Sequence, residues 1–138
     1  MKIVVPEKMG DDLRLIPASV YSATFKEAFV GTSAAKQPKM TVRWIITSEP
    51  QDGPADPPTT VETLLDSYSL QENSMWRFNK TFRSLTDKNL PQDDFDEQTF
   101  QAFVNENLAG MEATLDVGVE PRQDTGEERN RVNKVSKA

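Results

Sequence analysis

The sequence predicts a mainly β protein with the order β-β-β-α-α-β-β, in which five strands form a barrel and a helical segment interrupts them. Apolar and polar residues alternate in residues 40–47 and 111–120, as they do in a strand with one buried face. Between these stretches, apolar residues recur at spacings of three and four in residues 75–85, as they do on one face of a helix. The spacing of apolar residues therefore changes from that of a strand to that of a helix and back to that of a strand.

Three strands are predicted before the helices. Residues 19–30 are rich in β-branched and aromatic side chains and predict the first strand, and a turn-like stretch separates it from the second, residues 40–47. Residues 49–58 hold four prolines, which cannot donate ladder hydrogen bonds, so this segment is expected to be an exposed loop. The strand pattern resumes in residues 59–70 and predicts the third strand.

A helical insert is predicted over residues 73–109. The first helix has one apolar face and several polar sides, formed respectively by Met75, Phe78, Phe82 and Leu85 and by Trp76, Asn79, Lys80 and Arg83. The second helix is expected to begin after Asp96, a good N-cap residue, with Phe95 and Phe100 at the positions of a hydrophobic staple. Gly110 stands where a helix C-terminal cap belongs.

Two strands are predicted after the helices. Residues 111–120 alternate cleanly, a polar turn follows, and residues 129–135 predict the last strand. We expect one domain over residues 1–138, with an irregular start in residues 1–12, because a chain of this length can bury a single core. A five-stranded sheet with helices between its third and fourth strands has the element order of the OB-fold, a partly open Greek-key barrel.

The residue inventory excludes many kinds of chemistry. The chain has no Cys and no His, so disulfides, thiolate chemistry, Cys/His zinc sites and imidazole catalysis are excluded. The acidic group of Asp93, Asp94, Asp96 and Glu97 lacks the spacing of a calcium loop and suits a helix N-terminus. The glycines form no phosphate-binding pattern. We therefore expect a protein that is not an enzyme and that holds no metal and no cofactor.

The sequence also predicts a protein that does not contact a membrane. No apolar run approaches the roughly 18 residues that a membrane span needs, and the start lacks the apolar stretch of a signal peptide. The expected location is the cytoplasm, which is the host cell cytoplasm if the protein is viral.

Charge is distributed unevenly along the chain, whose net charge is −6. Residues 1–48 hold seven basic and four acidic residues, residues 49–120 four and fifteen, and residues 121–138 five and three. If the two basic ends fold together, they form a basic face on an acidic body and orient a polyanion. Scattered, solvated charge is the alternative.

Several short segments resemble a known family. They are Leu15-Ile16-Pro17 before Tyr21, Gly31-Thr32-Ser33 with Gln37-Pro38-Lys39-Met40, Trp76-Arg77-Phe78, and Asn130-Arg131-Val132-Asn133-Lys134-Val135. Together they resemble small phage proteins of unassigned function from replication and recombination gene clusters, which look like single-stranded DNA-binding proteins. The resemblance implies three kinds of partner: single-stranded DNA, a replication or recombination protein, and further copies of the chain. Residues 134–138 are not acidic, which argues against recruitment of a protein partner by an acidic tail.

The OB-fold places its ligand groove across the second and third strands, between the first and last hairpin loops. Non-specific single-strand binding needs cations for the backbone and exposed aromatic faces for the bases. This mapping predicts phosphate contacts by Lys36, Lys39, Arg43, Arg122, Arg129, Arg131 and Lys134, and base stacking by Phe29, Trp44 and Tyr68.

Each of these groups has an alternative interpretation. Trp44 shares a face with apolar residues, so it could instead pack in the core. Tyr68 and Phe29 could each be either exposed or buried. Trp76 is expected to close the end of the barrel. The basic last strand could be an edge strand kept soluble by its charge.

The leading hypothesis is a phage-type, non-sequence-specific single-stranded DNA-binding protein that acts in DNA replication or recombination without catalysis. The alternative is a protein–protein interaction module or virion assembly component that uses the same barrel, which the acidic middle of the chain favours. A third hypothesis is a carboxylate-only enzyme with Glu62 and Asp66 on one face of the third strand, for which no partner group is visible.

Overall fold

The computed structural model describes residues 14–92, 95–122 and 125–138. The predicted irregular start and two of the acidic residues, Asp93 and Asp94, lie outside this range. The elements are β1 (Ser19–Thr32), β2 (Pro38–Ile46), β3 (Thr63–Ser69), α1 (Trp76–Thr86), α2 (Glu97–Leu108), β4 (Glu112–Pro121) and β5 (Glu128–Lys137). The predicted order β-β-β-α-α-β-β is confirmed.

The third strand is shorter than predicted. It begins at Thr63, because Val61 has a φ of 67°, which no regular strand residue adopts. The preceding loop, residues 49–58, is exposed for most of its length as predicted, although Pro50 is buried. Arg14 holds the end of this loop through hydrogen bonds from its guanidinium to the carbonyl oxygens of Pro57 and Pro58, at 2.9 and 2.8 Å.

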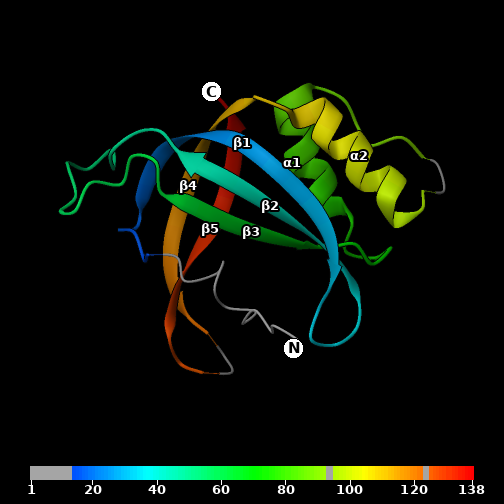
Figure 1. Cartoon of the computed structure of the whole chain (residues 1–138), viewed down its shortest axis with the longest axis horizontal. Coiled ribbons are helices and arrows are strands. Elements are labelled where there is room, and N and C mark those ends of the chain that lie inside the picture. The colour runs from blue at the N-terminus through cyan, green and yellow to red at the C-terminus, as the bar shows by residue number, and fades with distance from the viewer. Residues whose placement is uncertain (1–13, 93–94, 123–124) are drawn as a thin grey trace, which may run out of the picture.

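All five strands form one antiparallel sheet in the order β3-β2-β1-β4-β5. Figure 1 shows that the sheet curls, so that β4 and β5 pass behind β2 and β3, and that both helices lie at one end of it. No backbone ladder joins β3 to β5 in the part of the chain that the structure describes. Some Cα atoms of these two edge strands nevertheless lie within 8 Å of each other. We call the gap between the two strands the β3–β5 seam.

A β-bulge in β1 decides which side chains face inward. The register against β2 shifts between Phe25 and Glu27. Before the bulge Phe25 is buried, and after it Ala28 is buried while Glu27 and Phe29 are not. Because one extra residue reverses the alternation, Glu27 and Phe29 lie on the outward side of the sheet.

The hydrophobic core fills the inside of the curled sheet. Trp44 packs edge to face on Phe25, with their ring centroids 5.9 Å apart. Helix α1 contributes its predicted apolar face, of which Phe78, Phe82 and Leu85 are buried. This burial fixes α1 against the open end of the sheet and leaves its polar side free to form a surface.

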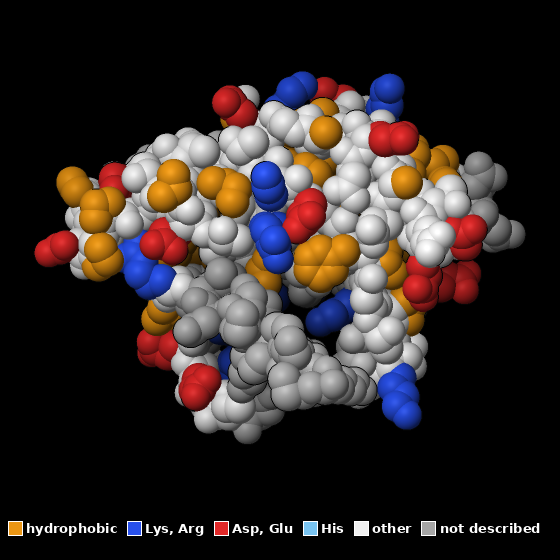
Figure 2. Space-filling model, viewed as in Figure 1, with side chains coloured by type: hydrophobic (Ala, Val, Ile, Leu, Met, Phe, Trp, Pro, Cys, Tyr) orange, Lys and Arg blue, Asp and Glu red, His pale blue; other side chains and the backbone are white. Residues whose placement is uncertain are grey.

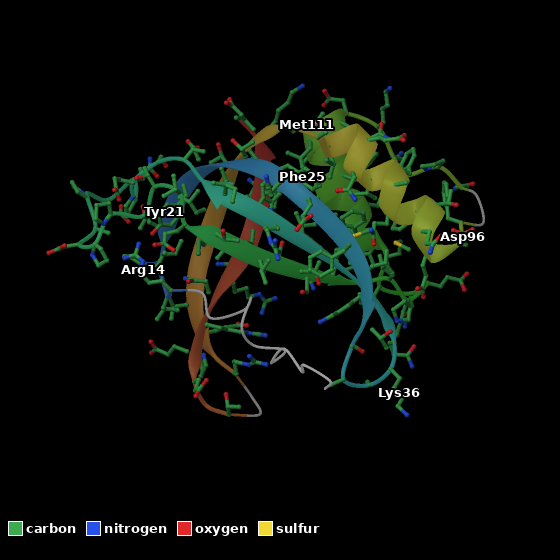
Figure 3. The ribbon with its side chains drawn as sticks, viewed as in Figure 1. Arg14, Tyr21, Phe25, Lys36, Asp96 and Met111 are labelled. Atoms are coloured by element: carbon green, nitrogen blue, oxygen red, sulfur yellow. The ribbon has the colours of Figure 1, made fainter. Side chains whose placement is uncertain are left out.

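The predicted start of the second helix is confirmed. The Asp96 carboxylate, at the start of α2 in Figure 3, accepts a hydrogen bond of 2.7 Å from the Thr99 backbone N–H. The rings of Phe95 and Phe100 lie 5.7 Å apart. Gly110 follows the helix with a φ of +69°, a conformation that glycine adopts without strain.

No helix within the described ranges is both long and apolar enough to cross a membrane.

Candidate nucleic-acid interface

The outward face of β1, β2 and β3, called here the sheet face, carries cationic, aromatic and hydroxyl side chains. The register places Glu27 opposite Arg43 and Phe29 opposite Thr41, and Thr41 and Ser67 of β3 share a hydrogen bond of 3.3 Å. Figure 2 views this side of the molecule and shows Lys and Arg side chains near its middle, beside acidic and hydrophobic ones. The face therefore combines charge with apolar surface.

A hollow of about 250 Å³ lies at one end of the sheet face, below the β1–β2 hairpin. Most of its lining surface is apolar, and hydroxyl and amide groups and the Lys39 ammonium stand among it. The lining residues are Ser33, Ala35, Gln37, Pro38, Lys39, Ser67, Tyr68, Ser69 and Gln71. Lys36 extends from the tip of the hairpin (Figure 3). Such groups are the ones that donate hydrogen bonds to phosphate and sugar oxygens.

Arg43 is held in place within the sheet face. One terminal nitrogen, Nη1, lies 2.8 Å from Glu27 Oε1. Its Nε is buried and has no hydrogen-bond partner. Strand β2 carries two cations, Lys39 and Arg43. Glu27 partly neutralises the charge of Arg43, so Lys39 keeps more of its positive charge.

A second hollow, of about 260 Å³, separates helix α1 from strand β5. We call it the α1–β5 groove. Cations stand on both of its walls, Arg77 and Lys80 on the helix and Arg131 and Lys134 on the strand. The other lining residues are Tyr68, Trp76, Thr81, Ser84, Val132, Asn133 and Val135. Trp76 is 64% exposed, so the expectation that it closes the end of the barrel is wrong.

Two of the predicted stacking residues are buried. Trp44 is 0% exposed because it alternates with Met40, Val42 and Ile46 on the inward side of β2. Tyr68 is 5% exposed, and its hydroxyl oxygen accepts a hydrogen bond of 3.0 Å from Thr81 Oγ1. Neither ring has a free face for a base, which corrects the prediction for both.

The predicted cations fall in three places. Lys36, Lys39 and Arg43 lie on the sheet face or its hairpin, and Arg131 and Lys134 line the α1–β5 groove. Arg122 and Arg129 belong to the β4–β5 hairpin, where the Arg122 backbone is hydrogen-bonded to Glu127 and Gly126. The predicted cations from the two ends of the chain, all of which lie within the described residues, therefore do not line one common hollow.

Glu120 compensates two of these arginines. Its carboxylate lies 2.9 Å from a terminal nitrogen of Arg129 and 3.1 Å from one of Arg131. These hydrogen bonds hold the pKa of Glu120 below its usual range. A ligand phosphate would have to compete with Glu120 for both arginines, whereas Lys134 is exposed and forms no ion pair within the described residues.

A buried carboxyl group lies close to the β3–β5 seam. Asp66 Oδ2 is buried without a hydrogen-bond partner, and this burial raises the pKa of Asp66 to about 6. Hydrogen bonding to Tyr68 and the charges of Arg77 and Arg131 oppose part of that increase. The Arg77 guanidinium also lies over the Tyr68 ring, 5.9 Å from its centroid. Asp66 thus attracts one cation from each wall of the α1–β5 groove.

Sequence reasoning missed three residues of this groove, Trp76, Arg77 and Lys80. The signal was present in α1 itself, which holds three basic residues and no acidic one. Charge sums over long segments concealed it, because α1 lies within the most acidic part of the chain.

No family model matches the chain, and no curated protein matches it significantly. The resemblance to phage proteins therefore stays a prediction. Among the described residues, no group of three or more acidic side chains is placed to hold a metal ion.

Proposed function

We propose that this protein binds single-stranded DNA without sequence specificity, as a phage-type protein of DNA replication or recombination. The observation that carries the proposal is the composition of the sheet face, where Phe29 and Arg43 share the outward side with Lys39, and Lys39 lines a largely apolar hollow that also holds hydroxyl and amide groups. Non-specific single-strand binders combine a cationic track with aromatic surface in this way.

The proposal includes a finer description of the fold, a partly open OB-type barrel. The strand order β3-β2-β1-β4-β5, the helices between β3 and β4 and the approach of β3 to β5 all support it. In an OB-fold the strand 2–3 face and the loops of the first and last hairpins bind oligonucleotides. The sheet face is the corresponding surface here.

Each group on the sheet face has a role in the proposed complex. Lys36 and Lys39 contact phosphates, and Ser67, Ser69 and Gln37 donate hydrogen bonds to phosphate or sugar oxygens. Phe29 offers its ring to a base, an interaction worth about 1–3 kcal/mol. None of these contacts reads a base edge, which is why no sequence preference is expected.

The proposed function involves no reaction. The carboxylates of Glu62, just before β3, and of Asp66, within β3, both interact with cations in the folded protein. Glu62 Oε1 lies 3.0 Å from Arg14 Nε, and the charges of Arg77 and Arg131 act on Asp66. This arrangement supports a structural role for Glu62, and it leaves Asp66 as a buried carboxyl group beside two cations.

Fluorescence anisotropy of a labelled oligothymidylate tests the proposal. We expect binding that weakens as salt is added, and affinities reduced about tenfold by Phe29→Ala and severalfold by Lys39→Gln. Lys88→Gln, which removes a cation outside both hollows, should bind like the wild type. The absence of salt-sensitive binding at low ionic strength would overturn the proposal.

The same sample distinguishes the alternative function. If light scattering shows a stable oligomer or partner complex while oligonucleotides leave the protein unchanged, the fold serves as an interaction or assembly module. That outcome replaces the DNA-binding proposal.

A further inference from the structure

Helix α1 is a basic element within the acidic part of the chain. Residues 49–120 carry only four basic residues, and Arg77, Lys80 and Arg83 are all on this helix, which holds no acidic residue. The opposite wall of the groove adds Arg131 and Lys134. Positive charge is therefore concentrated where the surrounding sequence is negative, which is the pattern expected of an anion-binding site.

Trp76 is an exposed indole among these cations. The other tryptophan, Trp44, is 0% exposed, whereas Trp76 is 64% exposed. Trp76 and Lys80 are four residues apart on α1, so they are neighbours on one side of the helix, with about 5–6 Å between their Cβ atoms. An aromatic face and a cation are thus presented together at the edge of the groove.

The α1–β5 groove adjoins the sheet face. Tyr68, near the end of β3, lines both the hollow below the β1–β2 hairpin and the groove. The two hollows therefore lie on either side of the same strand end. A single chain that leaves the sheet face at this point can continue into the groove.

We propose that the α1–β5 groove is a second binding site for single-stranded nucleic acid, in which Trp76 stacks on a base and Arg77, Lys80 and Lys134 contact phosphates. This inference rests on the proposed function, because it extends the path of the same strand beyond the sheet face. It adds α1 to the proposed interface. The binding residues predicted from the sequence all lie in strands or hairpins.

The lining of the groove favours nucleic acid over an acidic peptide. Cations on two walls can follow a repeating backbone charge, and the Asn133 amide supplies a further hydrogen-bond donor. The exposed indole provides the flat apolar surface that every base can use. Arg131 contributes less, because it is already paired with Glu120.

Oligonucleotide length separates the two sites experimentally. An oligothymidylate of about 5 nucleotides can occupy only one hollow, whereas one of about 16 can span both. We expect Trp76→Ala to weaken binding of the long oligonucleotide about tenfold. Trp76→Phe, which keeps an aromatic ring, should lose much less, and Lys80→Gln with Lys134→Gln should lose affinity and salt sensitivity.

Intrinsic fluorescence reports the stacking directly. Because Trp44 is buried, quenching by the long oligonucleotide should come from Trp76 and disappear in Trp76→Phe. Trp76 is exposed, so thermal melting of Trp76→Ala should match the wild type and exclude misfolding as the cause of weaker binding.

Failure of this inference differs from failure of the proposed function. If the long oligonucleotide binds but its affinity and the Trp76 fluorescence are unaffected by these changes, the groove is not part of the path and binding belongs to the sheet face alone. If a polyglutamate peptide quenches Trp76 and the oligonucleotide does not, the groove is a peptide site and this inference is overturned. If no oligonucleotide binds the wild type, the proposed function itself is wrong.

Discussion

At the scale of single residues, Asp66 is a carboxyl group whose ionisation opposes folding. Its pKa is about 6 in the folded protein because of burial, against an ordinary value near 4. Between these pH values the folded state binds more protons than the unfolded state. The free energy of unfolding should therefore fall as pH rises from about 4 to about 6.

Replacement of Asp66 by Asn tests this linkage. The amide cannot ionise, so Asp66→Asn should lose its share of the pH dependence and be more stable than the wild type at pH 7, by about 2 kcal/mol. Urea unfolding between pH 4 and pH 7 measures the effect. Glu106→Gln, at an exposed position of α2, serves as the control. Parallel wild-type and Asp66→Asn profiles would contradict the assigned burial.

The aromatic residues show what a residue pattern can and cannot predict. The alternation around Trp44 indicated its core position as one of two interpretations, and the structure selects that one. Phe29 could not be placed, because the bulge between Phe25 and Glu27 reverses the alternation without a clear signal in the sequence. Trp76 was misplaced because a helical apolar face identifies buried residues but does not distinguish among the remaining sides.

At the scale of elements, the start of α2 depends on one side chain. Asp96 accepts the Thr99 N–H, and this hydrogen bond holds the pKa of Asp96 below its usual value. Its contribution to stability is therefore present at neutral pH and is lost as pH falls through the lowered pKa.

Substitution of this cap residue should have a graded effect. Asp96→Ala leaves a backbone N–H without its acceptor and should lower the Tm by a few degrees, whereas Asp96→Asn keeps an acceptor and should lower it little. Thermal unfolding followed by circular dichroism measures both. Equal Tm values for the two variants would show that the cap hydrogen bond does not stabilise the helix start.

The elements themselves were largely predictable, because period 2 and period 3.6 are direct consequences of strand and helix geometry. The third strand was predicted to begin at residue 59 because the sequence pattern does not reveal the positive φ of Val61. The three basic residues of α1 can be read from the sequence. Only the structure shows that the cations of β5 lie across a groove from them. Binding surfaces that join distant segments depend on sheet order, which the sequence specifies only indirectly.

At the scale of the whole molecule, a protein of net charge −6 can bind a polyanion only through a local concentration of cations. Within residues 14–92, 95–122 and 125–138, five cations of the two sites form no ion pair with an acidic group: Lys36, Lys39, Arg77, Lys80 and Lys134. Arg43 and Arg131 are compensated by Glu27 and Glu120. The five cations without an ion pair set the expected dependence of binding on salt.

The salt dependence of oligonucleotide binding should therefore be steep but limited. Each phosphate contact with a single strand contributes a slope of about −0.7 in log affinity against log salt concentration, so five contacts predict about −3.5. Lys80→Gln combined with Lys134→Gln should reduce the slope to about −2, and Lys88→Gln should leave it unchanged. Anisotropy titrations of a long oligothymidylate at several salt concentrations give these values. A slope near zero would mean that stacking rather than charge holds the strand, and an unchanged slope in the double variant would place the phosphates elsewhere.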